Sequence, residues 1–229
     1  MALQANQMSD TEHADCPYLL HSSLRLFAMV HKPLYAPSMP SGSNYCGDME
    51  MLCQRARGER LISTYLSPLD AVMGSRGLLD DGHFWPIDLQ HVDTRMFIEQ
   101  NGSLNIAINY AYAAFDNRLV VSERNNPLML YTGESFNVPT EQWKHFSIAF
   151  SDDLVRNIER TYVRAGLPSF VATLDTMSKW SAEQIADAAE DAVSRIPSTV
   201  FVGDVNDDAM SQGAIYDPES GDWMFLNFD

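Results

Sequence analysis

One cysteine in this chain stands where it could act as a nucleophile. Cys46 comes just before residues 48–57, where the sequence predicts a short helix. A thiol at the N-terminus of a helix has a lowered pKa and is therefore more reactive. Such a thiol also needs a base, and four histidines are candidates: His31, His83, His91 and His145. None stands at a diagnostic spacing, so catalysis by Cys46 is the alternative to the commoner role of a packed or loop thiol.

Two groups of residues resemble metal ligands, and neither has the required spacing. The first group is His83, Asp88, His91 and Asp93, whose histidines are too far apart for a zinc signature. Residues 204–208 resemble the first half of a calcium loop, but Ala209 and Ile215 stand where that loop needs glycine and glutamate. The sequence also lacks a glycine-rich phosphate loop. We therefore expect no metal and no cofactor.

Acidic side chains are the most unevenly distributed chemical groups in the sequence. Residues 180–229 contain eleven acidic residues and a single base, Arg195, which gives this segment −10 of the total net charge of −16. A field of this sign repels phosphate backbones and attracts basic surfaces. We therefore expect this end to bind a basic protein partner and no nucleic acid, with solubility alone as the alternative. The predicted partner-binding residues are Glu183, Asp187, Glu190, Asp191, Asp204, Asp207 and Asp208.

Three arginines form a second, smaller set of candidate binding residues. Arg156, Arg160 and Arg164 are spaced by four, so a helix would place them on one face. Such a face could bind a carboxylate surface or a phosphate as a secondary partner-binding site. Pairing of these arginines with acidic residues of the same helix, such as Asp153, is the commoner outcome.

The elements that must position these residues begin with a polar tail, residues 1–15. Apolar residues at helical spacing then predict a helix from Pro17 to His31, and a second helix is expected over residues 48–57. Ser67, Pro68 and Asp70 have the types and order of a helix start. The N-terminal part is therefore predicted to be helical.

Alternating apolar residues predict strands in the middle of the chain. Runs around residues 96–98 and 104–112 are separated by Asn101-Gly102, a strong hairpin signal. Further turns at residues 116–117 and 125–127 lead to expected strands at residues 119–121 and 128–132. Together these elements predict a central antiparallel meander.

The last third of the sequence predicts helices followed by a hairpin. Residues 139–196 have helical periodicity, and Ser181 and Gln184 fit a capping box. Two expected strands then flank the turn at residues 218–221. The predicted fold class is α+β: N-terminal helices, a central antiparallel β-meander, a helical segment over about 139–196 and a C-terminal β-hairpin. Residues 16–229 are expected to form a single domain, with a subdivision near 137–150 as the alternative.

Composition restricts the setting in which this protein works. The sequence has no apolar run near the roughly 20 residues that span a bilayer, no signal-peptide pattern and only three cysteines. These features predict a cytoplasmic protein that does not enter a membrane. Twelve of the fifteen basic residues are arginine, a bias typical of GC-rich bacterial genomes and their mobile elements.

Three functions follow from these residues. The first is a non-catalytic inhibitor, such as an anti-CRISPR or DNA mimic of a phage or mobile element, whose acidic end binds a nucleic-acid-handling protein. The second is a small cytoplasmic hydrolase that uses Cys46 with a histidine. The third is a structural or assembly component of a phage or plasmid, in which the C-terminal strand pairs with another subunit. Neither the partner nor the oligomeric state follows from the sequence.

Overall fold

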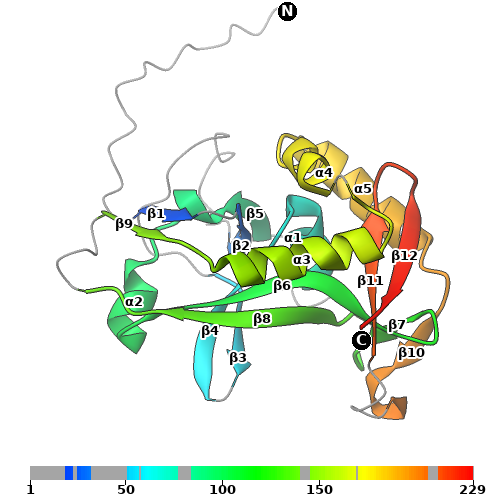
Figure 1. Cartoon of the computed structure of the whole chain (residues 1–229), viewed down its shortest axis with the longest axis horizontal. Helices are drawn as coiled ribbons and strands as arrows, with labels where there is room; N and C mark the ends of the chain where they lie inside the picture. Colours follow the sequence, from blue (N-terminus) through cyan, green and yellow to red (C-terminus); the bar gives the residue numbers. More distant parts are fainter. Residues whose placement is uncertain are drawn as a thin grey trace, which may run out of the picture.

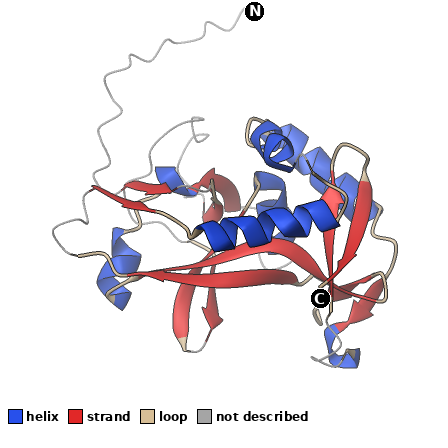
Figure 2. Cartoon of the chain, viewed as in Figure 1, coloured by secondary structure: helices blue, strands red, loops and turns tan. Residues whose placement is uncertain are grey.

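A mixed β-sheet dominates the computed structural model of this chain (Figures 1 and 2). Ten strands form this sheet, and two more form a small parallel sheet. Helices pack on both faces of the large sheet. The structure describes residues 19–22, 25–31, 51–56, 58–76, 84–139, 145–168, 170–205 and 211–228.

The long strand β6 (Leu104–Phe115) lies at the centre of the large sheet. Strand β4 (Glu59–Tyr65) pairs in parallel with its first half, and β11 (Gln212–Asp217) pairs antiparallel with its second half. The opposite edge pairs with β8 (Met129–Phe136) and β7 (Arg118–Val121), both antiparallel. Since β6 is paired along both edges and buried over most of its length, its sequence is rich in apolar and small residues.

The remaining strands extend the sheets outward from this centre. Beyond β4 the order continues with β2 and then β5, β3 forms a hairpin with β4, and β12 forms a hairpin with β11. Strand β10 pairs in parallel with β7, and β1 pairs in parallel with β9. Their bounds are β1 Leu19–Ser22, β2 Phe27–His31, β3 Cys53–Ala56, β5 Phe84–Asp88, β9 His145–Ile148, β10 Thr199–Phe201 and β12 Asp222–Asn227.

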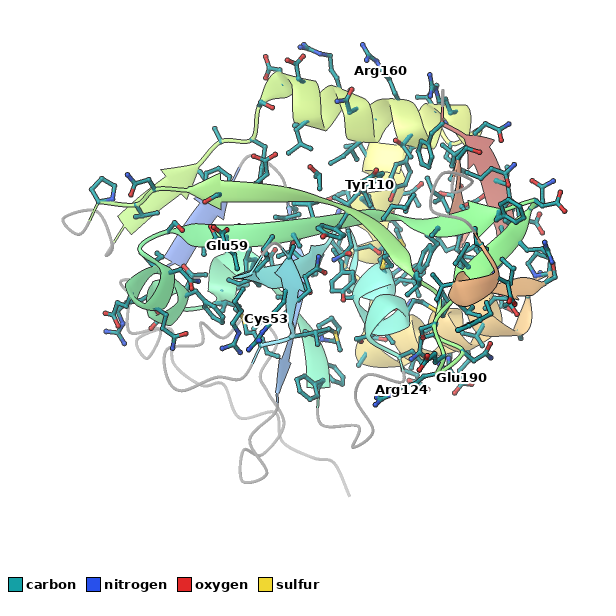
Figure 3. The ribbon with its side chains drawn as sticks, turned by 90° about the horizontal axis from the view of Figure 1, so that it is seen from below. Cys53, Glu59, Tyr110, Arg124, Arg160 and Glu190 are labelled. Carbon is teal, nitrogen blue, oxygen red and sulfur yellow. The ribbon has the colours of Figure 1, made fainter. Side chains whose placement is uncertain are left out.

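Helices cover the two faces of the sheet unequally. Figure 3 shows α3 on one side of the central strands and α1 and α5 on the other. Leu154, Ile158 and Tyr162 of α3 share a buried cluster with Ile106 and Ile108 of β6. The helices are α1 Pro68–Ser75, α2 Arg95–Asn101, α3 Asp152–Arg164, α4 Phe170–Met177 and α5 Ala182–Ser194, with short 3-10 turns η1 Leu89–His91 and η3 Val202–Asp204.

The cluster under α1 and α5 is built around two aromatic side chains. Tyr112 of β6 and Trp223 of β12 meet edge to face, with ring centroids 5.1 Å apart. Leu69 from α1 and Ala189 and Ala192 from α5 belong to the same buried cluster. A large apolar side chain such as Leu69 contributes about 1.5–3 kcal/mol when it is fully removed from water. This cluster therefore fixes both helices to the sheet.

The first two predicted helices, over residues 17–31 and 48–57, are wrong. Residues 19–22 and 27–31 form β1 and β2, and β3 occupies residues 53–56 of the second predicted helix. Five consecutive residues, 26–30, are all buried. A continuous buried run suits a strand covered on both faces, whereas a helix of this kind buries one stripe. The turn between β3 and β4 uses Gly58 at φ 85°, a left-handed conformation that glycine adopts without strain.

The predicted central meander is also wrong, for two reasons. Residues 95–101 form α2, and Gly102 at φ 70° is its left-handed C-cap instead of a hairpin turn. In addition, β4 pairs with β6 in parallel, so the central sheet is mixed. The turn at residues 116–117 and the strands on either side of it are confirmed, with both turn residues at positive φ.

Several local predictions are confirmed. Helix α1 begins after Ser67, whose hydroxyl accepts a hydrogen bond from the Asp70 amide. Three helices lie within residues 139–196, although β9 precedes them. The C-terminal hairpin forms, and β11 joins it to the large sheet beside β6. The sheet-dominated fold therefore differs from the predicted class in its first half far more than in its second.

One carboxyl group lies at the junction between α1 and β6. The Ser67 hydroxyl donates to Asp70 Oδ2 at 2.7 Å, and the Tyr112 hydroxyl donates to Asp70 Oδ1 at 3.1 Å. Burial of the carboxyl raises the pKa of Asp70, and these two hydrogen bonds lower it by less. Burial and the charge of Asp70 both raise the pKa values of Tyr65 and Tyr162 nearby. The folded environment therefore shifts the titration of Asp70 to higher pH.

Replacing Asp70 with Asn is expected to change how stability depends on pH. A carboxyl whose folded pKa is raised contributes stability below its ordinary pKa of 3.8, and this contribution is lost as pH rises through the folded pKa. As pH rises from 3.8 to the folded pKa of Asp70, the unfolding free energy of the Asp70→Asn variant should therefore rise relative to that of the original chain. Denaturant unfolding at a series of pH values measures this difference, with Glu123→Gln as the exposed control. A flat or falling difference would contradict the assignment.

Candidate functional site

The candidate site is a row of three carboxylates on the outer face of α5. Glu183, Asp187 and Glu190 are all exposed, and their spacing of four and three residues places them on one side of the helix. We call these three residues the acidic stripe. Figure 3 shows Glu190 at the periphery of the molecule. The stripe therefore faces solvent.

Local sequence explains why α5 forms where it does. The Ser181 hydroxyl accepts from the Gln184 amide at 3.2 Å, and the Gln184 side chain accepts from the Ser181 amide at 2.8 Å. The predicted capping box is thus confirmed, and it satisfies two amides that have no partner inside the helix. Ile185, Ala189 and Ala192 form the buried side of the helix. Acidic and apolar residues consequently lie on different faces.

Side chains of the C-terminal hairpin anchor the end of α5. The Trp223 indole N–H donates to the Ala192 carbonyl at 2.9 Å, and the Tyr216 hydroxyl donates to Asp191 Oδ2 at 2.6 Å. Arg195 Nε donates to the other Asp191 oxygen at 2.8 Å. The hydrogen bonds from Tyr216 and Arg195 lower the pKa of Asp191. Asp191 therefore differs from the stripe, because internal partners already use its carboxylate.

The carboxylates of the acidic stripe form no ion pair with a described residue. Among the residues that the structure describes, none forms an ion pair with Glu183, Asp187 or Glu190. Arg195, the one base in residues 180–229, is bound to Asp191. Like charges at these helical spacings cost a few tenths of a kcal/mol per pair.

Apart from the acidic stripe and Asp191, the only predicted acidic binding residue that the structure describes is Asp204. Asp204 is exposed and belongs to η3, which follows α5 in the sequence. Asp207 and Asp208 lie outside the described residues, so their part in binding stays a prediction. In the described part of the chain, no three His, Cys, Asp or Glu side chains are placed to hold a metal ion.

The three predicted arginines share α3 but have different surroundings. Arg156 donates to Asp153 at 2.7 Å, as a helical ion pair should. Arg160 donates to the neutral Asn157 Oδ1 at 3.4 Å, and Arg160 and Arg164 both line a cavity. Arg160 and Glu190 lie on opposite sides of the molecule in Figure 3. The structure therefore does not bring the arginines and the acidic stripe together.

The cysteine candidate cannot be placed in a site. Cys46 lies outside the described residues, as do His83 and the side chains of His31 and His145. Cys53 is described and half-buried, and burial raises the pKa of its thiol more than Arg60 lowers it. A thiol with a raised pKa is a poor nucleophile. The hydrolase alternative thus stays a prediction.

The sequence matches no protein-family model, and no match was found among curated proteins or solved structures. Within the described ranges, moreover, none of the helices has the length and apolar character needed to cross a bilayer.

Sequence reasoning missed the residues that orient α5. Tyr216 and Trp223 are 25 and 31 residues away from their partners on the helix. Their only signal in sequence is that Tyr and Trp carry a polar atom that must find a partner when the ring is buried. That signal predicts a hydrogen bond but does not name the acceptor. Sequence reasoning also missed Tyr110 and Phe228, which line the cavity beside α3, because they come together there from distant parts of the chain.

The capping box predicts a measurable loss of stability. Replacing Ser181 with Ala removes the acceptor for the Gln184 amide, and the expected loss is about 1 kcal/mol of unfolding free energy. Ser198→Ala, an exposed serine outside the helix, is the matched control and should change stability little. Denaturant unfolding measures both variants. Equal stability of the two variants would show that α5 does not depend on this cap.

Proposed function

We propose that this protein binds a partner protein through the acidic stripe of α5 and catalyses no reaction there. The observation that carries the proposal is a row of three exposed carboxylates, none of them in an ion pair with a described residue. A row of like charges lowers the stability of its own helix. Binding to a basic surface would offset this repulsion.

Rigidity supports a binding role for this surface. The capping box fixes the start of α5, and Trp223 and Tyr216 fix its end against the hairpin. A surface that is already ordered loses little conformational entropy when it binds. Carboxylates on such a surface also increase the association rate with a basic partner, more than they increase affinity.

The spacing of the stripe supports a more specific proposal about the partner. From residue 183 to residue 190 a helix rises about 10 Å, which gives one carboxylate every ~5 Å. One strand of DNA carries a phosphate about every 3.4 Å, a density of the same order. We therefore propose that the partner is a nucleic-acid-handling protein whose basic groove the stripe occupies. An inhibitor from a phage or mobile element would have this property.

Neutralising the stripe should abolish capture of such a partner. The test compares the original chain with Glu183→Gln/Asp187→Asn/Glu190→Gln as baits in bacterial lysate at low salt. The matched control is Glu59→Gln/Glu99→Gln/Glu123→Gln, which removes the same charge from three other exposed positions. A basic protein retained by the original chain and the control, but lost with the stripe variant, is the expected result.

Two outcomes would contradict the proposal. One is that all three baits retain the same proteins, because the stripe then contributes nothing specific. The other is that both triple variants lose the partner equally, because total charge and not the stripe then determines binding. Association rates of the purified pair at increasing salt provide the quantitative check, since steering by the stripe weakens as salt screens it.

A further inference from the structure

A cavity lies between α3 and the sheet, far from the acidic stripe. Its volume is about 360 Å³, near the lower end of the ~300–1,000 Å³ typical of small-ligand sites. Figure 3 shows Arg160 projecting outward from α3 and Tyr110 on the strand side. The residues that line the cavity include Tyr110, Asn157, Ile158, Arg160, Arg164 and Phe228.

The charge of this cavity is opposite to that of the protein. Arg160 and Arg164 line it and no described acidic residue does, although the chain has 31 acidic and 15 basic residues. Arg160 forms no ion pair with a described residue, and its bond to Asn157 is long and to a neutral oxygen. Arg156 is different, because it binds Asp153 and does not line the cavity. The described lining of the cavity is therefore positively charged.

The rest of the lining is suited to a flat apolar group. Leu154 and Ile158 are buried behind the cavity, and the half-buried Tyr110 and Phe228 add two aromatic rings. Burial raises the pKa of Tyr110, so its hydroxyl stays protonated. The Asn157 carbonyl oxygen accepts from Arg160, which leaves its NH₂ group as a donor. Rings, two cations and neutral donors thus surround one space.

We propose that this cavity binds a small molecule in which an anionic group is joined to a planar ring. The guanidinium groups of Arg160 and Arg164 bind the anionic group, because a planar fork of N–H donors matches phosphate and carboxylate oxygens. The ring lies against Tyr110 and Phe228, which provide apolar and stacking contacts. Phosphate esters and carboxylates share this chemistry, and the probes below distinguish them.

Titration calorimetry at low salt tests the proposal with four probes. Adenosine monophosphate represents ring phosphates and indole-3-acetate represents ring carboxylates. Adenosine lacks the charge, and inorganic phosphate lacks the ring. At least one of the first two should bind with a dissociation constant below about 1 mM, and the last two should bind at least about tenfold more weakly.

Two arginine variants locate the binding. Arg160→Gln should weaken the bound probe about tenfold, since it removes a charge-assisted hydrogen bond. Arg156→Gln removes the same charge one turn earlier on the same helix and should change binding less than about twofold. Both arginines are exposed, and circular dichroism checks that each variant is folded.

Three results would overturn the proposal. Failure of both ring anions to bind at millimolar concentration would show that the cavity takes no such ligand. Equal weakening by Arg156→Gln and Arg160→Gln would show diffuse attraction instead of a site. Equal binding of inorganic phosphate and adenosine monophosphate would show that the rings play no part. None of these results bears on the acidic stripe, which lies on another helix.

Discussion

Backbone pairing along both edges of β6 sets the positions of nearly everything else in this protein. β4 and β11 use one edge, and β8 and β7 use the other. A strand paired in this way cannot shift by one residue without moving every side chain to the opposite face. Because the register is fixed, the helices that pack on the two faces are fixed as well. One edge of β6 changes its neighbour along the strand, because β4 pairs with residues 106–109 and β11 pairs with residues 112–114. This change divides the strand into two parts.

The two candidate surfaces take their positions from these two parts of β6. Its second half pairs with β11, whose hairpin partner β12 carries Trp223, and Trp223 holds the end of α5. Its first half packs against α3, beside which the arginine-lined cavity lies. One strand thus relates an acidic surface and a basic cavity that lie on different sides of the sheet (Figure 3). Such separation keeps the two opposite charges from neutralising each other.

The sequence predicts well those elements whose signals are local. Ser67 and Ser181 identify helix starts because a side chain caps an amide only three residues away. Asp116 and Asn117 identify a turn because Asp and Asn adopt positive φ more readily than most residues, as both do here. The prediction fails where distant pairing decides the outcome. Residues 26–30 have apolar groups that fit a helix, but β4 and β5 lie on either side and make this segment a strand.

The same difference between local and long-range signals applies to the candidate site. The acidic stripe follows from the sequence, because its spacing needs only a helix, and α5 has its own cap. By contrast, the sequence does not reveal that Tyr216 binds Asp191, because the two residues are 25 positions apart. The cavity beside α3 needs β6, β8, α3 and Phe228 in one place, and helical spacing reveals only its arginines.

The central claim is that β6 joins both halves of the described structure into one cooperative unit, and native-state hydrogen exchange measures this directly. Amides of residues 105–109 pair towards β4 and β8, whereas those of residues 111–114 lie among β7, β8 and β11. If the claim is correct, both groups are among the slowest to exchange and open with the same free energy, equal to that of global unfolding. If one group exchanges through a separate opening of lower free energy, the two halves unfold independently and the account is contradicted.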